Sequence, residues 1–235
     1  MTDMMDLIIR AFPHLLKSRT RAGELLKSFR AFGCPHPVRI GPRNFTTTSV
    51  TMANKTACVL LAQGAEEMEA VIAIDCLRRA GITVTVVGVD ATQVKCSREV
   101  TIVADKALAD VENQIFDVVV LPGGLQGAKT LSANPTVGKM LKVQEGAGRI
   151  VAAICAAPMA LAAHGIGKGK NATIYPTMES HLPGYNCKDD NVVVDGKMIT
   201  SRGPGTAFQF ALRIIKELLG EEKAKSVAKP MLVDF

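Results

Sequence analysis

Tryptophan is absent from the 235-residue sequence, and tyrosine occurs only twice. Single-stranded nucleic acids bind proteins largely by stacking their bases on aromatic side chains. Long apolar runs are missing too, since none approaches the roughly 20 residues that a membrane-spanning helix needs. We therefore expect no nucleic-acid partner and no membrane span.

Cysteine motifs are also missing. No two cysteines form a CxxC pair, and no Cys/His cluster has zinc spacing. Acidic Asp3 and Asp6 interrupt what would be the basic part of a secretory signal. We therefore expect no metal, no cofactor, and free thiols in a reducing compartment. The six cysteines are Cys34, Cys58, Cys76, Cys96, Cys155 and Cys187.

The net charge of +6 belongs almost entirely to the first part of the chain. Residues 1–51 hold eight Lys/Arg and three Asp/Glu, whereas residues 52–235 hold twenty and nineteen. We predict an N-terminal extension over 1–51 and one domain over 52–235. The extension is a disordered leader, a transit peptide, or a segment before an internal start at Met52. We expect a cytoplasmic protein, and we consider an additional mitochondrial or nuclear pool.

From residue 56 onward, short apolar runs alternate with helical patterns. Such alternation predicts parallel β-α-β units with helices on both faces of the sheet. The expected fold is α/β: a three-layer, flavodoxin-like sandwich (class I glutamine amidotransferase-like) with a mainly parallel sheet. Strands are expected within residues 56–62, 82–89, 116–124, 149–154 and 191–201, and helices within 66–81, 134–148, 156–165 and 205–220.

Cys155 stands where the strand at 149–154 meets the following helix. Sites of doubly wound folds lie at the carboxyl ends of strands, and helix amides favour an anion. We therefore expect the pKa of the Cys155 thiol to be lowered. The amides of Gly123, Gly124 and Ala156 are expected to bind an oxyanion or an oxidised sulfur. The alternative is an inert core cysteine, as we expect for Cys58 and Cys76. Cys187 is expected in an exposed loop, and Cys96 in a short strand near the surface.

Three glutamates, Glu66, Glu67 and Glu69, open the predicted helix at 66–81. Acidic residues are common at solvated helix starts, which is the simplest explanation. Glu66 and Glu69 share a helix face, so one of them could also reach the sulfur of Cys155. Burial there would raise the pKa of the carboxyl and make it a general acid or base.

Five segments occur in an order and spacing that resemble the DJ-one (parkinsonism-associated deglycase) family of the ThiJ/PfpI superfamily. The resemblance covers residues 52–235 and implies a homodimer with the flavodoxin-like fold. It also implies that Cys155 is the cysteine oxidised to a sulfinate, with Glu69 as its protonated partner and Gly123 and Gly124 as the oxyanion-binding turn. The segments are LLAQGAEEMEAVIAIDCLRRAGI, CSREV, DVVVLPGG, GRIVAAICAAP and TSRGPGTAFQFAL.

Further residues take their expected roles from the same resemblance. Arg79 and Arg98, with Cys96 beside them, match the family's interface region. Arg202 and Pro204 match a loop near the cysteine. Tyr175 stands where well-studied members have a histidine linked to glyoxalase activity, and Ala104 where they have a further cysteine. His181, in the loop after Tyr175, is a candidate substitute for that histidine.

The resemblance implies a redox-sensitive protein that protects cells from oxidative stress, sensing peroxide through Cys155. One alternative is a cofactor-independent glyoxalase or protein deglycase that acts on small reactive carbonyls such as methylglyoxal through a Cys155 hemithioacetal. Another is a redox-regulated chaperone or binding module. A Cys–His peptidase is disfavoured, because His164 lies far along the helix after Cys155.

Overall fold

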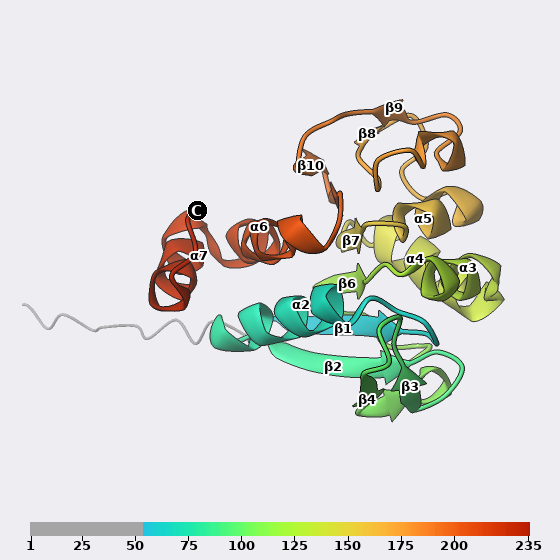
Figure 1. The fold of residues 1–235 in the computed structure, drawn as a ribbon, viewed down its shortest axis with the longest axis horizontal. Helices are drawn as coiled ribbons and strands as arrows, with labels where there is room; N and C mark the ends of the chain where they lie inside the picture. The colour runs from blue at the N-terminus through green and yellow to red at the C-terminus, as the bar shows by residue number, and fades with distance from the viewer. Residues whose placement is uncertain (1–53) are drawn as a thin grey trace, which may run out of the picture. The chain divides into compact units, whose positions relative to one another are not determined.

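The central sheet consists of seven strands, in the order β10-β11-β7-β6-β1-β2-β5 (Figure 1). The computed structural model describes residues 54–235. All neighbouring strands run parallel except β10, which pairs with β11 as an antiparallel hairpin. The strands are β1 (Thr56–Leu61), β2 (Thr83–Gly88), β5 (Lys106–Ala107), β6 (Val118–Leu121), β7 (Ile150–Ile154), β10 (Val192–Asp195) and β11 (Met198–Ser201).

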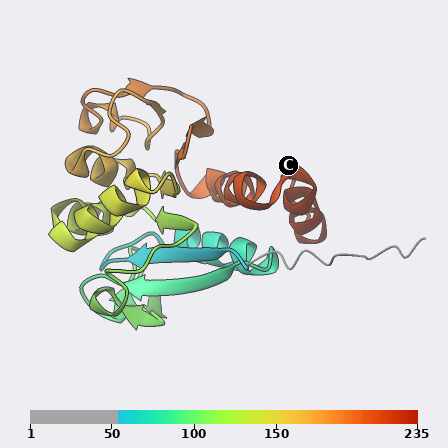
Figure 2. The same ribbon diagram turned by 180° about the vertical axis from the view of Figure 1, so that it is seen from behind.

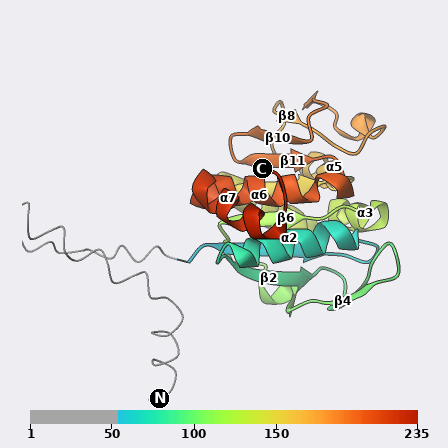
Figure 3. The same ribbon diagram turned by 60° about the vertical axis from the view of Figure 1, so that its left-hand side comes forward.

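Helices cover both faces of this sheet and complete the three layers. Figure 3 shows α2 and α6 side by side across one face, with α7 next to α6, and Figure 2 gives the view from behind. This face carries α2 (Glu67–Arg79), α6 (Ala207–Leu219) and α7 (Glu221–Ala228). The other face carries α3 (Leu125–Ala133), α4 (Pro135–Gly146) and α5 (Pro158–His164).

The two faces of β1 show why its continuous apolar run suits a central strand. Ala57, Val59 and Leu61 pack in one hydrophobic cluster with α2 and α6. Cys58 and Leu60 point the other way, into a second cluster with α3, α4 and α5. Successive side chains of a strand alternate between faces, so a strand buried on both sides needs apolar residues throughout.

The described residues also form two small sheets and several short turns outside the central sheet. β3 (Gln93–Lys95) and β4 (Thr101–Val103) form an antiparallel pair, and β8 (Asn171–Ala172) pairs in parallel with β9 (Asn186–Cys187). Short 3-10 turns are η2 (Leu108–Asp110), η3 (Glu179–His181), η4 (Pro204–Thr206) and η5 (Lys229–Met231).

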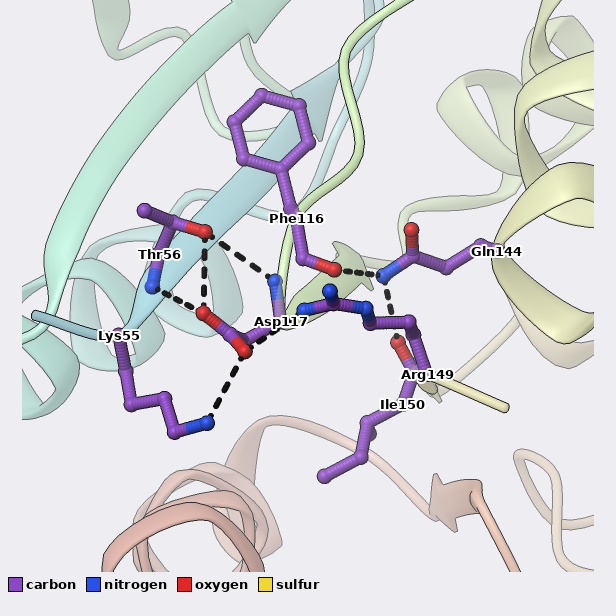
Figure 4. Close-up of polar contacts among 7 residues, drawn as sticks. All are labelled: Lys55, Thr56, Phe116, Asp117, Gln144, Arg149 and Ile150. Atoms are coloured by element: carbon purple, nitrogen blue, oxygen red, sulfur yellow. Dashed lines mark hydrogen bonds and ion pairs between the residues drawn. The ribbon is translucent and has the colours of Figure 1, made fainter. Parts of the chain in front are cut away.

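The amino ends of three central strands meet at one carboxylate, Asp117 (Figure 4). It accepts hydrogen bonds from the backbone N–H and hydroxyl of Thr56, at 2.9 and 3.2 Å. Lys55 at 3.1 Å and Arg149 at 2.8 Å bind its other oxygen. Nearby, the buried amide of Gln144 donates to the carbonyl of Phe116. These contacts hold β1, β6 and β7 in register at the end opposite Cys155.

The predicted fold class and predicted elements are confirmed, and the strand segment predicted over 191–201 forms the antiparallel pair of β10 and β11. Two helices, α3 and α7, were not predicted. Cys96 was assigned wrongly, because it is buried and lies just after β3 rather than in a surface strand. No helix in residues 54–235 is long and apolar enough to cross a membrane. The predicted boundary at 51/52 lies outside the described residues and stays a prediction.

Candidate active site

Cys155 lies immediately after β7, in a sharp turn before α5. Its backbone has a φ of +62°, a left-handed conformation that is uncommon for a residue with a side chain. Its N–H donates to the carbonyl of Ser201 at 2.9 Å, and its carbonyl accepts from Tyr175 at 2.9 Å. Such strained residues cost about 1–3 kcal/mol and cluster at functional sites. The two neighbouring chain segments therefore hold Cys155 in a conformation that it would not adopt alone.

Glu69, in the first turn of α2, extends to the backbone of Gly123, next to Cys155. Its side chain is fully buried. One carboxyl oxygen, Oε2, accepts a hydrogen bond from the N–H of Gly123 at 2.7 Å. The other oxygen, Oε1, is buried and has no hydrogen-bond partner among the described residues. A buried carboxylate oxygen without a donor is costly, which favours a protonated carboxyl.

Burial raises the pKa of Glu69 to about 7. The Gly123 hydrogen bond and the interaction with Cys155 lower the pKa, and the charge of Glu66 raises it further. The sequence analysis predicted this rise in the pKa of the carboxyl. Near neutral pH, this carboxyl can therefore hold or release a proton beside the sulfur.

Gly123 separates the two side chains. A Cβ atom added at Gly123 would lie 2.6 Å from Cβ of Cys155 and 2.7 Å from Oε2 of Glu69. Both distances are too short for real contacts, so only glycine lets the cysteine and the carboxyl approach this closely. Gly123 was predicted to bind an oxyanion, but its N–H is already used by Glu69. It positions the carboxyl, and the amides of Gly124 and Ala156 are left to bond the sulfur.

The predicted lowering of the thiol pKa is wrong. Burial raises the pKa of Cys155 to about 12, and the negative charge of Glu69 adds to the effect. Hydrogen bonds from Gly124 and Ala156 lower it, but they do not offset burial. α5 begins only at Pro158, after a turn, and not directly at Cys155 as the prediction assumed. Cys155 is thus not an independently acidic thiol, and its ionisation depends on where the proton of Glu69 resides.

A pocket of about 540 Å³ opens beside Cys155. Its polar lining includes Glu66, Ser97 and Arg98. The hydroxyl of Ser97 lies 2.6 Å from Glu66 Oε2, and the N–H of Arg98 donates to Glu67 at 2.9 Å. These bonds attach the loop between β3 and β4 to the start of α2. Arg98, predicted as an interface residue, is therefore also part of the pocket wall.

Some of the other predicted site residues line the pocket, and others do not. Tyr175 and Pro204 line the pocket, whereas Arg202 does not. The Arg202 guanidinium instead donates to the carbonyl of Asp189. Neither His181 nor His164 lines the pocket, and the ring of His164 contacts the carbonyl of Leu131 at 2.9 Å.

The remaining predictions concern the surface and the other cysteines. Arg79 is exposed and forms an ion pair with Asp75 on the same helix. Cys58 and Cys76 are buried in the core, and Cys187 is exposed, as predicted. Burial raises the pKa of Cys96 to about 11. Within residues 54–235 there is no group of three or more His, Cys, Asp or Glu side chains that could hold a metal.

Sequence reasoning missed several residues that line the pocket. Leu125 and Gln126 begin α3 directly after the glycine pair, and Met178 precedes η3. Gly64 lines the pocket from the loop before α2. Their positions depend on loops that meet only in the folded protein, so no local pattern indicates them.

The sequence profile of the DJ-1/PfpI family matches residues 55–217. The chain belongs to the DJ-1/PfpI family. Protein dj-1beta of Drosophila melanogaster is 54% identical over 185 residues, which are 77% of this chain and 99% of that protein. The crystal structure of Drosophila melanogaster DJ-1beta superposes with a TM-score of 0.76, covering 78% of this chain and 100% of that chain.

A further DJ-1/PfpI relative carries an enzyme name. "Glutathione-independent glyoxalase DJR-1.2" of Caenorhabditis elegans is 43% identical over 182 residues, covering 76% of this chain and 97% of that protein. These matches establish the family and the fold of the domain that contains Cys155 and Glu69.

Proposed function

We propose that Cys155 and Glu69 form a reactive cysteine–carboxyl pair through which the protein senses peroxide and protects cells from oxidative stress. The observation that carries the proposal is the buried Glu69 carboxyl. One of its oxygens is held by Gly123 and the other has no partner among the described residues, beside a cysteine in a strained turn. The expected partners of this pair are peroxides and small reactive carbonyls.

The pair shares protons rather than ionising independently. When Glu69 holds its proton, its charge no longer opposes the thiolate, and the carboxyl can donate to sulfur. The amides of Gly124 and Ala156 then stabilise the anion. Proton transfer from the thiol to the Glu69 carboxylate therefore creates the nucleophile by moving the pair's single negative charge onto the sulfur, where these two amides stabilise it.

Oxidation follows from attack of the thiolate on one oxygen of hydrogen peroxide. The O–O bond breaks, sulfur gains that oxygen, and the departing hydroxide takes up a proton to become water. The product is a sulfenic acid. A second peroxide molecule oxidises it to the sulfinic acid and releases a second water. The same amides and the Glu69 carboxyl would hold the sulfinate oxygens.

The test is the intact mass and peptide map of the protein after mild peroxide treatment. We expect Cys155 to gain two oxygens before any other cysteine does. Buried Cys58, Cys76 and Cys96 are the internal controls, and exposed Cys187 controls for simple accessibility. Earlier oxidation of Cys187 would contradict the proposal, because exposure would then explain reactivity better than the pair.

A second candidate function, cofactor-independent glyoxalase activity, is supported by the 540 Å³ pocket at the sulfur and by the name of the nematode relative. The thiolate would add to the aldehyde carbon of methylglyoxal and form a hemithioacetal. Glu69 would then move a proton from that carbon to its neighbour, and the hemithioacetal hydroxyl proton would pass to the former ketone oxygen, giving a thioester. Water would hydrolyse the thioester, releasing lactate and the free thiol.

Lactate formation by wild type and by Cys155→Ala distinguishes the two functions. Glyoxalase activity requires lactate from the wild-type protein and none above background from the variant. Equal rates would remove the enzymatic candidate and leave peroxide sensing unaffected.

Homodimerisation is part of the same proposal. The start of α2 presents Met68 and Val71 with 54% and 50% of their surfaces exposed, one turn apart on one side of the helix. Val100, 49% exposed, follows the Ser97–Arg98 segment that is bonded to the same helix end. Exposed apolar side chains in one region favour an interface with a second copy.

A further inference from the structure

The pocket beside Cys155 has an apolar wall that peroxide sensing does not use. Its members are Leu125 at the start of α3, Tyr175 and Met178 in the loop before η3, and Pro204 in η4. Leu125 and Tyr175 are 52% and 45% exposed. A pocket of about 540 Å³ has the size of a small-molecule binding site. Neither peroxide nor methylglyoxal is large enough to cover these side chains.

Backbone contacts fix Tyr175 relative to the sulfur. Its N–H donates to the carbonyl of Cys155 at 2.9 Å, and its own carbonyl accepts from Met178 at 3.0 Å. A Cβ atom added at Gly203 would lie 3.5 Å from the Tyr175 ring, so the ring packs against the bare backbone of Gly203. The ring is therefore held in place, one backbone hydrogen bond away from the reactive residue.

The Tyr175 hydroxyl takes no part in this arrangement. Among the hydrogen bonds within residues 54–235, none involves its phenol oxygen. What the residue offers the pocket is the surface of its ring. That surface suits an apolar substituent on the carbon next to the one that Cys155 attacks.

We propose that Tyr175, with Leu125 and Met178, makes the pocket selective for α-oxoaldehydes that carry a branched or aromatic apolar substituent, in preference to methylglyoxal. The inference rests on the proposed addition of Cys155 to such carbonyls. The sulfur bonds to the aldehyde carbon, the carbonyl π bond breaks, and the oxygen takes the proton released from the thiol through Glu69. The substituent on the adjacent ketone carbon then lies against the apolar wall.

The experiment uses the full-length protein with two probes, methylglyoxal and isobutylglyoxal, which differ only in their alkyl group. Each aldehyde is titrated against alkylation of Cys155 by iodoacetamide, followed by peptide mass, which gives the affinity of the hemithioacetal. Each affinity is divided by the affinity of N-acetylcysteine for the same aldehyde, which removes differences in carbonyl reactivity. Short incubations and peptide masses exclude arginine adducts at Arg98.

We expect the normalised affinity for isobutylglyoxal to exceed that for methylglyoxal about tenfold, the discrimination typical of an apolar pocket. Tyr175→Ala should lower this ratio at least threefold, whereas Tyr175→Phe should keep it, since the ring is retained. Phe208→Ala is the matched control: Phe208 is 36% exposed on α6 and does not line the pocket. Its ratio should equal that of wild type.

Two outcomes overturn the inference in different ways. A wild-type ratio near one, or an unchanged ratio in Tyr175→Ala, would show that the wall does not select the substituent, while addition to Cys155 would stand. If neither aldehyde protects Cys155, carbonyl addition itself fails, and the inference fails with it.

Discussion

At the scale of single residues, the reactivity of the site depends on which of two groups, the Cys155 thiol or the Glu69 carboxyl, carries the negative charge. Burial raises the pKa values of both Cys155 and Glu69, so neither ionises easily alone. Together they can release one proton and keep the other. The resemblance predicted this partnership, but position along the chain suggested an acidic thiol, because the burial of Cys155 is invisible in the sequence.

Asp117 gives a residue-scale prediction about stability. Asp117→Asn should lower the free energy of unfolding by about 2–3 kcal/mol, because the charged hydrogen bonds from Lys55 and Arg149 lose their acceptor charge. Burial opposes the charged form, but the hydrogen bonds from Thr56 and Lys55 outweigh it and lower the pKa of Asp117 in the folded state. Its stabilisation is therefore present above the ordinary aspartate pKa and lost as the pH falls through the folded-state value.

Urea denaturation at neutral and acidic pH measures this effect. The difference between wild type and Asp117→Asn should shrink at acidic pH. Asp189→Asn is the control, because Asp189 is 97% exposed and lies 3.9 Å from Arg202, so its loss should change stability by less than about 0.5 kcal/mol. Equal effects of the two substitutions would contradict the structural role of Asp117.

At the scale of elements, the turn after β6 sets the distance between the carboxyl and the thiol. Gly123→Ala should displace Glu69 from Cys155 and slow peroxide oxidation of Cys155 at least tenfold, since the added methyl overlaps both side chains. The φ of Gly123 is not in the left-handed region, so the effect is steric. Peptide mass analysis over a peroxide time course provides the rate.

Gly146→Ala is the matched control for this substitution. A Cβ at Gly146, the last residue of α4, would meet nothing within 4 Å. Alanine favours helix over glycine by up to about 1 kcal/mol, so this variant should be at least as stable as wild type. Oxidation at the wild-type rate in Gly123→Ala would show that the site tolerates the methyl group.

The sequence pattern predicted the central strands and the longer helices, but not the two helices α3 and α7. β1, β6 and β7 are short apolar runs flanked by polar residues, and α2, α4 and α6 have long apolar periodicities with clear ends, so all were predicted. The nine residues of α3 contain Gly127 and begin at a glycine pair, which hides the helix. α7 is short and buries only Ala224, Val227 and Ala228, too few for a periodic signal.

The pocket was harder to predict than the reactive pair. Tyr175 and Pro204 entered through the family resemblance alone, and Leu125 and Met178 were not identified at all. These residues come from the start of α3, the loop before η3 and the turn η4, and these segments meet only in the complete fold. Their position in the chain carries no periodic pattern.

At the scale of the whole molecule, we expect a homodimer. Sedimentation at micromolar concentration should give twice the mass of one chain. Val71→Glu should shift the protein towards the monomer, because it places a charge among the exposed apolar side chains at the start of α2. Val143→Glu, at a residue 47% exposed on α4 over the other face, should remain dimeric. A wild-type monomer would contradict the proposal.

The central claim is that Cys155 and Glu69 share a proton, and the pH dependence of Cys155 alkylation tests it most directly. Wild type should show a first rise in reactivity near pH 7, where the pair loses its first proton, and a second rise at much higher pH. Glu69→Gln should show a single rise in reactivity. The pH of this rise should be no lower than that of the first wild-type rise and lower than that of the second, because no carboxylate charge then opposes the thiolate. Identical two-step curves for both proteins, or a wild-type curve with no rise near pH 7, would contradict the account.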